Sequence, residues 1–184
     1  MTSKKVFAIL AIGVVVVLVA VVLWRLPGRE PSPKSLLKTA LNAADSPQRV
    51  HAAVELTQML ADRERTLPYV RQLATETKDP EVLAIGVRGL AWALDGDSVP
   101  IYLTAMEHED SKVREAGVLA MKTIGGGTLG DGIFGPIGKK LTFAPGDPPE
   151  SRRAVVKELR ALYELRLADE AEYKAMEAAF RSGK

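Results

Sequence analysis

The sequence predicts an all-α protein with an N-terminal transmembrane helix, a short α-solenoid of helical hairpins, and C-terminal helices. Three observations support this prediction. An uncharged apolar run covers residues 6–24, three self-similar segments begin at Ser46, Asp79 and Asp110, and a helical period resumes after Ser151. The composition agrees, because aromatic residues make up only 5% of the chain while Ala and Leu, both strong helix formers, are abundant.

We expect six segments in chain order. They are a basic n-region at residues 1–5, a transmembrane anchor at 6–24, a linker at 25–34, three helical hairpins at 35–125, a Gly/Pro-rich loop at 126–149, and C-terminal helices at 150–182.

The apolar run at residues 6–24 predicts a membrane anchor. A helix of this length spans about 28 Å, close to the thickness of one hydrocarbon core. Lys4 and Lys5 precede the run, as in an export signal, but the run exceeds the length of a signal-peptide core and no small-residue cleavage site follows it. We therefore expect an uncleaved, single-pass signal-anchor. The basic n-region favours an exported soluble domain, whereas the basic residues that follow the span favour the opposite orientation. We expect the N-terminus in the cytoplasm and the soluble domain on the exported side.

The charge distribution argues against a nucleic-acid partner. Three of the 25 basic residues, Lys4, Lys5 and Arg25, lie within residues 1–25, which contain no acidic residue. The rest of the chain carries 22 basic and 23 acidic residues, without the basic excess that a nucleic-acid surface needs. The absence of cysteine excludes a thiolate nucleophile and a cysteine-based zinc site.

The three self-similar segments predict a repeated helix. Each begins with Ser46, Asp79 or Asp110, residue types that cap helix N-termini. Each has a small residue seven positions later, which implies close helix–helix approach: Ala53, Gly86 and Gly117. A second helical segment precedes each copy, at residues 35–44, 67–78 and 99–109. The unit is therefore a hairpin of about 32 residues, and stacked hairpins supply one another's core.

These segments resemble the HEAT and HEAT-like repeat family over residues 33–125. The family's second helix opens with Asp-Pro-x-Val-Arg, followed by a small residue and a Leu–Gly–Ile tail. The third copy matches at Asp110, Val113, Arg114, Gly117, Ala120, Met121, Ile124 and Gly125, and the second at Asp79, Pro80, Val82, Gly86, Gly89 and Leu90. Leu83 stands where Arg is expected, and in the first copy Arg49 and Val50 are transposed. The resemblance implies a scaffold or binding surface.

The C-terminal third predicts two further helices. Asp169 and Glu172 have the spacing of a capping box between them. The segment resembles the short C-terminal hairpin family called SHOCT at Leu162, Leu167, Asp169, Glu172 and Tyr173, with Arg166 in place of the usual turn glycine. That resemblance implies oligomerisation or a membrane-associated role. The alternative is that these helices cap the open end of the solenoid.

The glycine-rich stretch after residue 124 raises the question of phosphate binding. Seven glycines share it: Gly125, Gly126, Gly127, Gly130, Gly132, Gly135 and Gly138. A Walker A loop has four residues between its first glycine and the glycine before the lysine, and a Ser or Thr after the lysine. Here five residues separate Gly132 from Gly138, and Lys140 follows Lys139. We expect a flexible loop that ends the repeat array and offers an adjustable binding segment.

No catalytic or metal constellation is predicted. Glu107, His108, Glu109 and Asp110 are consecutive at a turn, so their side chains fan outwards instead of converging on an ion. His51 has no partner at ligand spacing. We expect no cofactor and no enzyme activity.

The best candidates for partner binding are three aromatic residues on the repeat helices, Trp92, Tyr69 and Tyr102. The predicted function is a membrane-anchored, non-catalytic scaffold that mediates protein–protein interaction. One alternative is a self-assembling membrane-associated subunit that uses its C-terminal hairpin. The other is a lyase-like or chaperone activity, as in some HEAT-like proteins.

Overall fold

The computed structural model describes residues 31–124, 144 and 146–182. The predicted anchor at residues 6–24 and the seven glycines of the loop lie outside the described residues. The chain divides into two units, Met1–Ser32 and Pro33–Lys184, and the second is described here. Every regular element among the described residues is helical, as the all-α prediction expects. Within this part of the chain, none of the helices combines the length and apolar character needed to cross a membrane.

Eight α-helices are described, together with two short 3₁₀ turns. The helices are α2 (Pro33–Asn42), α3 (Ser46–Gln58), α4 (Arg63–Glu76), α5 (Pro80–Trp92), α6 (Val99–Glu107), α7 (Ser111–Ile124), α9 (Pro149–Ala168) and α10 (Glu170–Arg181); the 3₁₀ turns are η1 (Met59–Ala61) and η2 (Gly96–Ser98).

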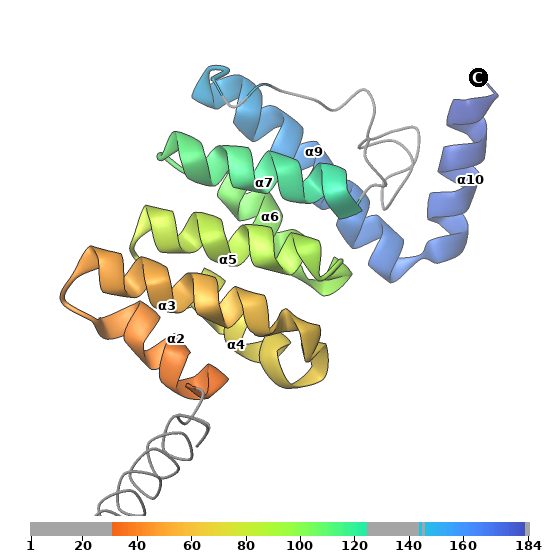
Figure 1. The fold of residues 1–184 in the computed structure, drawn as a ribbon. Coiled ribbons are helices and arrows are strands. Elements are labelled where there is room, and N and C mark those ends of the chain that lie inside the picture. The colour runs from red at the N-terminus through yellow and green to blue at the C-terminus, as the bar shows by residue number, and fades with distance from the viewer. Residues whose placement is uncertain (1–30, 125–143, 145, 183–184) are drawn as a thin grey trace, which may run out of the picture. The chain divides into compact units, whose positions relative to one another are not determined.

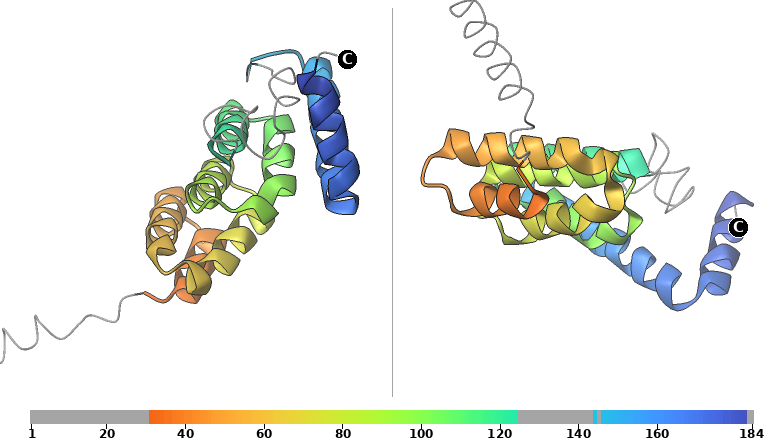
Figure 2. Two further views of the ribbon diagram at one scale, coloured as in Figure 1. Left: turned by 90° about the vertical axis from the view of Figure 1, so that its right-hand side faces the viewer. Right: turned by 60° about the horizontal axis from the view of Figure 1, so that its bottom comes forward.

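The helices of this unit pack as antiparallel hairpins in two layers. α2 packs against α3, α4 against α5, and α6 against α7. The second helices of the hairpins, α3, α5 and α7, lie side by side and run in the same direction (Figure 1). The first helices lie behind them, as the side view in Figure 2 shows. Equivalent positions on α3, α5 and α7 are therefore neighbours across one layer.

The structure corrects the alignment of the first repeat by one residue. Ser46 is not the cap that the sequence analysis expected. It is the first residue of α3, and Asp45 precedes it at the N-cap position. Asp79 and Asp110 are caps as predicted, since each carboxylate accepts hydrogen bonds from two backbone N–H groups of the following turn.

Counting from these three aspartates brings the repeats into register. The residues 7, 8 and 11 positions after each cap are buried in all three copies: Ala52, Ala53 and Leu56; Gly86, Val87 and Leu90; Gly117, Val118 and Met121. The small residue of the first copy is thus Ala52, and not Ala53. Four positions after the cap stand Arg49, Leu83 and Arg114, so Arg49 is not transposed.

Glycine allows the closest helix contacts, as predicted. A Cβ on Gly117 would lie 2.7 Å from the backbone nitrogen of Met106 and 2.9 Å from the carbonyl oxygen of Tyr102, both on α6. A Cβ on Gly89 would lie 2.5 Å from Cγ2 of Thr57 on α3. At Gly117 the close atoms are backbone, so α7 can sit at its observed depth against α6 only with glycine there, whereas at Gly89 the Thr57 side chain would have to move.

α9 continues the helical packing after the glycine-rich stretch, where the sequence analysis expected the array to end. It packs against α6 and buries Val156 and Leu159. The carboxylate of Asp169 accepts from the N–H of Glu172 at 2.9 Å, which is the N-cap half of the predicted capping box. α10 then packs against α9, and no other described element contacts it to a comparable extent.

Candidate functional site

Trp92 is the most prominent exposed apolar side chain in the described part of the chain. It is the last residue of α5, and 83% of it is accessible to solvent. Most large apolar side chains of this unit are buried in one continuous core, so the exposure of a tryptophan is unusual. Exposed tryptophans frequently anchor protein interfaces, because the ring offers a large contact area at small entropic cost.

The other two aromatic candidates do not join Trp92. Tyr69 on α4 is half-buried against the core. Tyr102 on α6 is completely buried, and its hydroxyl donates to the carbonyl oxygen of Asp95 at 3.0 Å. The prediction of Tyr102 as a partner-binding residue is therefore wrong. Its polar tip is satisfied inside the fold, where no partner can reach it.

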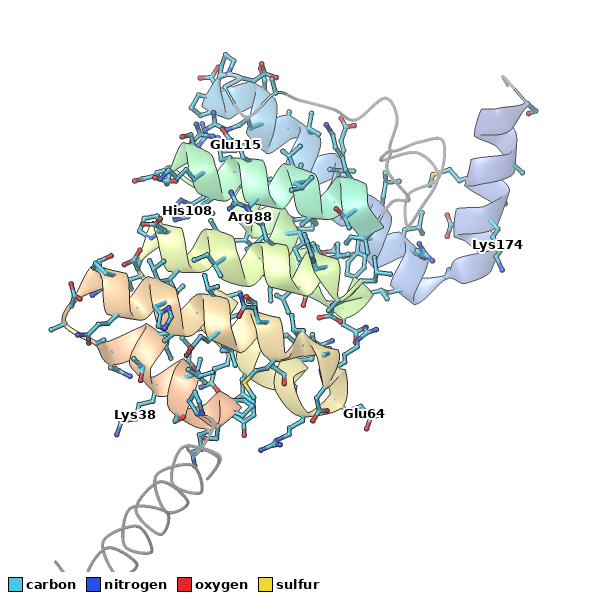
Figure 3. All side chains as sticks on the ribbon, viewed as in Figure 1. Lys38, Glu64, Arg88, His108, Glu115 and Lys174 are labelled. Atoms are coloured by element: carbon cyan, nitrogen blue, oxygen red, sulfur yellow. The ribbon has the colours of Figure 1, made fainter. Side chains whose placement is uncertain are left out.

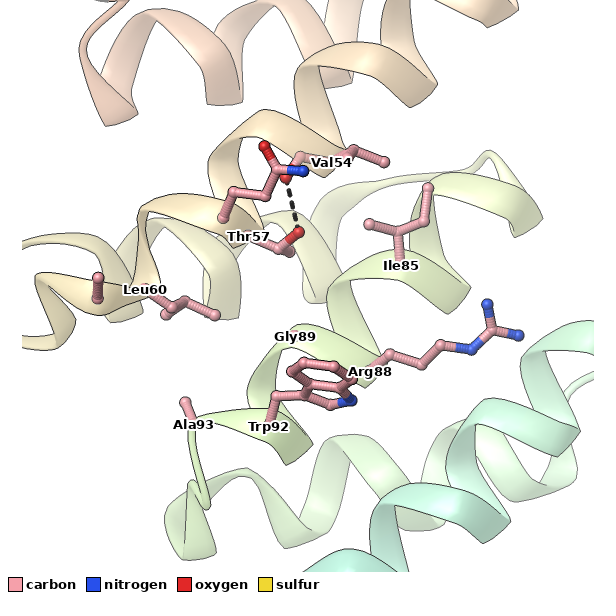
Figure 4. Close-up of a pocket in the computed structure, with 10 residues that line it drawn as sticks. Val54, Thr57, Leu60, Ile85, Arg88, Gly89, Trp92 and Ala93 are labelled. Atoms are coloured by element: carbon pink, nitrogen blue, oxygen red, sulfur yellow. Dashed lines mark hydrogen bonds between the residues drawn. The ribbon is translucent and has the colours of Figure 1, made fainter.

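A groove opens beside Trp92 on the layer of second helices. It has a volume of about 590 Å³ and runs between the C-terminal halves of α3 and α5. Its lining is mostly apolar and consists of Val54, Thr57, Gln58, Leu60, Ala61, Ile85, Arg88, Gly89, Trp92 and Ala93. Figure 4 shows Thr57 bonded to the carbonyl oxygen of Val54, with Trp92 and Arg88 on the α5 side. The volume lies within the range of sites that hold a peptide side chain or a small ligand.

The groove belongs to a larger row of outward-facing positions. The residues nine positions after the caps are Val54, Arg88 and Leu119, one on each of the three parallel helices. Arg88 is exposed, and Leu119 is 49% exposed. Trp92 lies one turn beyond Arg88 on the same face of α5. α3, α5 and α7 lie side by side, so the row faces the same side of the layer as the groove. We call these residues of the row and the groove the Trp92 surface: Val54, Leu60, Ile85, Arg88, Trp92 and Leu119.

Arg88 is the only charged residue among those that line the groove. None of the carboxylates in the described ranges forms an ion pair with it, whereas Arg49 is paired with Asp79 and Arg71 with both Asp95 and Asp97. The Arg88 side chain extends along the surface of α5 in the direction of α7 (Figures 3 and 4). The Trp92 surface therefore combines an apolar area with one positive charge, on Arg88, that forms no ion pair with the described residues.

A buried network holds the end of α5 on which Trp92 stands. Asp95 follows the helix, and its carboxylate accepts from Nε of Arg71 at 2.7 Å and from the hydroxyl of Ser98 at 2.5 Å. Leu94, which lies between α5 and η2, has a positive φ of 52°, a rare conformation for a leucine. Burial raises the pKa of Asp95, but the hydrogen bonds from Arg71 and Ser98 outweigh burial and hold that pKa below its usual value.

The histidines serve local structure. Nδ1 of His108 accepts from the N–H of Asp110 at 3.0 Å, so His108 supports the α6–α7 turn at which Figure 3 shows it. Nε2 of His51 lies 3.3 Å from Oε1 of Glu55, one turn further along the same helix. Within the described ranges, His, Asp and Glu side chains form no cluster of three that could hold a metal ion.

Sequence reasoning identified Trp92 but missed Arg88, Leu119 and the groove. The repeat alignment contained a signal, because Arg88 and Leu119 occupy equivalent positions after Asp79 and Asp110. Whether Arg88 and Leu119 are exposed depends on which side of α5 and α7 packs against the first helices of the hairpins. The sequence pattern alone did not assign that side.

Comparisons with known proteins add no relative: no family model, no curated protein and no solved structure matches this chain.

Proposed function

We propose that the protein is a membrane-anchored, non-catalytic scaffold of HEAT-like repeats that binds another protein through the Trp92 surface. Residues 6–24 form the single-pass anchor, and the repeat domain lies on the exported side. The observation that carries the proposal is an 83% exposed tryptophan beside a mostly apolar groove of about 590 Å³. Exposed apolar patches of this kind mark interaction sites in proteins that otherwise bury their apolar residues.

The assignment to HEAT-like repeats rests on the stacked hairpins and their shared register. Each second helix starts after an aspartate, and two of the three carry an arginine four positions later. Nη1 of Arg49 donates to the carbonyls of Ala43 and Ala44, and Nη1 of Arg114 donates to those of His108 and Glu109. The two arginines therefore perform the same local task, which is expected of a repeated unit.

Site-specific crosslinking in native membranes tests the scaffold function. A photoreactive amino acid at position 92 should crosslink a distinct protein, identified by mass spectrometry. The same amino acid at the exposed position of Lys38 on α2, which belongs to the other layer, is the matched control and should not crosslink that protein (Figure 3). If position 92 yields only the protein itself, or the same products as position 38, the scaffold function is wrong.

A second candidate function is self-assembly through the C-terminal helices. Leu167 near the end of α9 is 69% exposed, and α10 contacts little besides α9. If this hairpin holds copies of the chain together, a photoreactive residue at position 167 should crosslink the protein to itself. With the photoreactive residue moved to the neighbouring exposed position 168, replacing Leu167 with Gln should abolish the dimer band without affecting products from position 92.

The exported location has its own test. A reporter that is active only outside the cytoplasm, fused after Lys184, should be active. The matched reporter that works only in the cytoplasm should be silent, and the reverse pattern would place the repeat domain inside.

A further inference from the structure

We infer that the Trp92 surface recognises a short, acidic, apolar peptide segment of a partner protein, with the carboxylate paired to Arg88 and an apolar side chain seated in the α3–α5 groove. This inference rests on the proposed function, because it specifies the partner of the same surface.

The first argument is charge complementarity. Among the residues that line the groove, Arg88 alone is charged, and it forms no ion pair with a carboxylate of the described chain. An arginine beside apolar groups prefers a planar carboxylate, with which it can form two parallel hydrogen bonds. A lone arginine also matches a singly charged group, whereas phosphorylated motifs are usually bound by clusters of arginines.

The second argument is size. The groove follows α3 and η1 from Val54 to Ala61, and α5 from Ile85 to Ala93 just after its end, which corresponds to roughly 10–12 Å of helix. An extended peptide covers that length with about four residues. This is enough for one apolar anchor and its neighbours but too short for a large rigid interface.

The third argument is the placement of Trp92 relative to Arg88. The two residues are four positions apart on α5, which separates them by roughly 6 Å along the helix axis. A peptide whose apolar side chain contacts Trp92 therefore presents a carboxylate to Arg88 from a residue about two to four positions away. Thr57 and Gln58 line the α3 side and can bond the peptide backbone.

The protein supplies its own reporter for the test. The chain has two tryptophans, Trp24 and Trp92, so in a Trp24→Phe variant the fluorescence comes from Trp92 alone. We would reconstitute this full-length variant in lipid nanodiscs and select a random 12-residue peptide library on it. Counter-selection on the same protein carrying Trp92→Ala removes peptides that bind elsewhere. The expected result is enrichment of an apolar residue with Asp or Glu two to four positions away.

Charge reversal then tests the role of Arg88. A selected peptide should shift the emission of Trp92 to shorter wavelength, and Arg88→Glu should weaken its binding at least about tenfold. A peptide with Lys in place of the acid should bind Arg88→Glu better than the original peptide does. Lys122, exposed on α7, provides the control, because Lys122→Glu should leave binding nearly unchanged.

Four outcomes would overturn the inference. Selected peptides without acidic enrichment, or equal binding to Arg88→Glu, would remove the role of the carboxylate. Quenching of Trp92 by brominated lipids would show that this surface lies on the membrane. An emission that depends on protein concentration without peptide would indicate a second copy of the chain. If position 92 crosslinks a partner protein but the selected peptides carry no acidic residue, the inference about an acidic peptide is wrong. The proposed scaffold function would still stand.

Discussion

Arg49 on α3 joins two repeats by donating to the carboxylate that caps the next second helix. Its Nη2 lies 2.7 Å and its Nε 3.1 Å from Oδ2 of Asp79, while Oδ1 of the same carboxylate accepts from the N–H of Glu81 at 3.0 Å. The cap of α5 is therefore held in place by the preceding repeat, and this contact couples the two hairpins.

Replacing Arg49 with Met should destabilise the protein by about 1–3 kcal/mol at pH 7, because several charge-assisted hydrogen bonds are lost from a partly buried position. Urea unfolding of the full-length protein in mild detergent, followed by circular dichroism, measures this. The exposed Arg153 on α9 gives the control variant, Arg153→Met, for which we expect a change within about 0.5 kcal/mol.

The same contact predicts a pH dependence. Burial raises the pKa of Asp79, but the hydrogen bonds from Arg49 and from two backbone N–H groups outweigh burial and lower that pKa below its usual value. A carboxyl whose pKa is lower in the folded state contributes stability above the unfolded pKa, near pH 4, and loses it as the pH falls further. Arg49→Met should therefore cost less at pH 3 than at pH 7, and an equal cost at both pH values would contradict the pairing.

Removing Arg71 should lower the free energy of unfolding, because it leaves the buried carboxylate of Asp95 without its main cationic partner. We expect Arg71→Met to lose about 2–3 kcal/mol at pH 7, since Asp95 stays buried while its main cationic partner is gone. In the variant only Ser98 and Arg63 still oppose the effect of burial, so we expect the pKa of Asp95 to rise above its unfolded value. Protonation then favours the folded state, so the deficit should shrink as the pH falls from 7 to 4.5. A deficit that grows over this range would show that Asp95 remains ionised and satisfied by other groups.

Two glycines of the same register should respond differently to alanine. Gly117→Ala places a Cβ 2.7 Å from the backbone of α6, which has to move away, and we expect a loss of about 1–3 kcal/mol. At Gly86 the nearest atom is the Cβ of Ala74 at 3.3 Å, so a small shift accommodates the methyl group. The better helix propensity of alanine, worth about 1 kcal/mol, should offset that shift and keep Gly86→Ala near the parent stability. Thermal unfolding of both variants checks the difference.

Leu83 interrupts the arginine pattern at the junction of the second and third repeats. It is half-buried and lines a cavity of about 420 Å³ together with Ile101 and His108. An arginine there should reach Asp110, as Arg49 reaches Asp79. A double-mutant cycle of Leu83→Arg with Asp110→Asn, which keeps a good capping residue, should give a coupling of about 0.5–1.5 kcal/mol. A coupling near zero would mean that the two junctions differ in geometry as well as in residue type.

The helices were predictable because their signals are local. Aspartate caps, prolines in the first turn and apolar stripes placed α5 and α7 within a residue or two of their observed ends. The first repeat was shifted by one residue because Asp45 and Ser46 are both good caps, and only packing distinguishes them. The structure decided the matter by burying Ala52 and Leu56 together with their equivalents on α5 and α7.

The site was less predictable for a different reason. Trp92 and Tyr102 both looked like candidates in the sequence, yet one is exposed and the other fully buried. Which side of a repeat helix becomes surface depends on how the hairpins stack, and that arrangement depends on contacts between residues far apart in the chain, such as Gly117 with the backbone of α6. The sequence by itself determined the helices and, for the second and third repeats, the caps and the register, since these follow from interactions within a few residues. Only the tertiary structure decided that Arg88, Trp92 and Leu119 share one exposed surface, because exposure is a property of the packed layers.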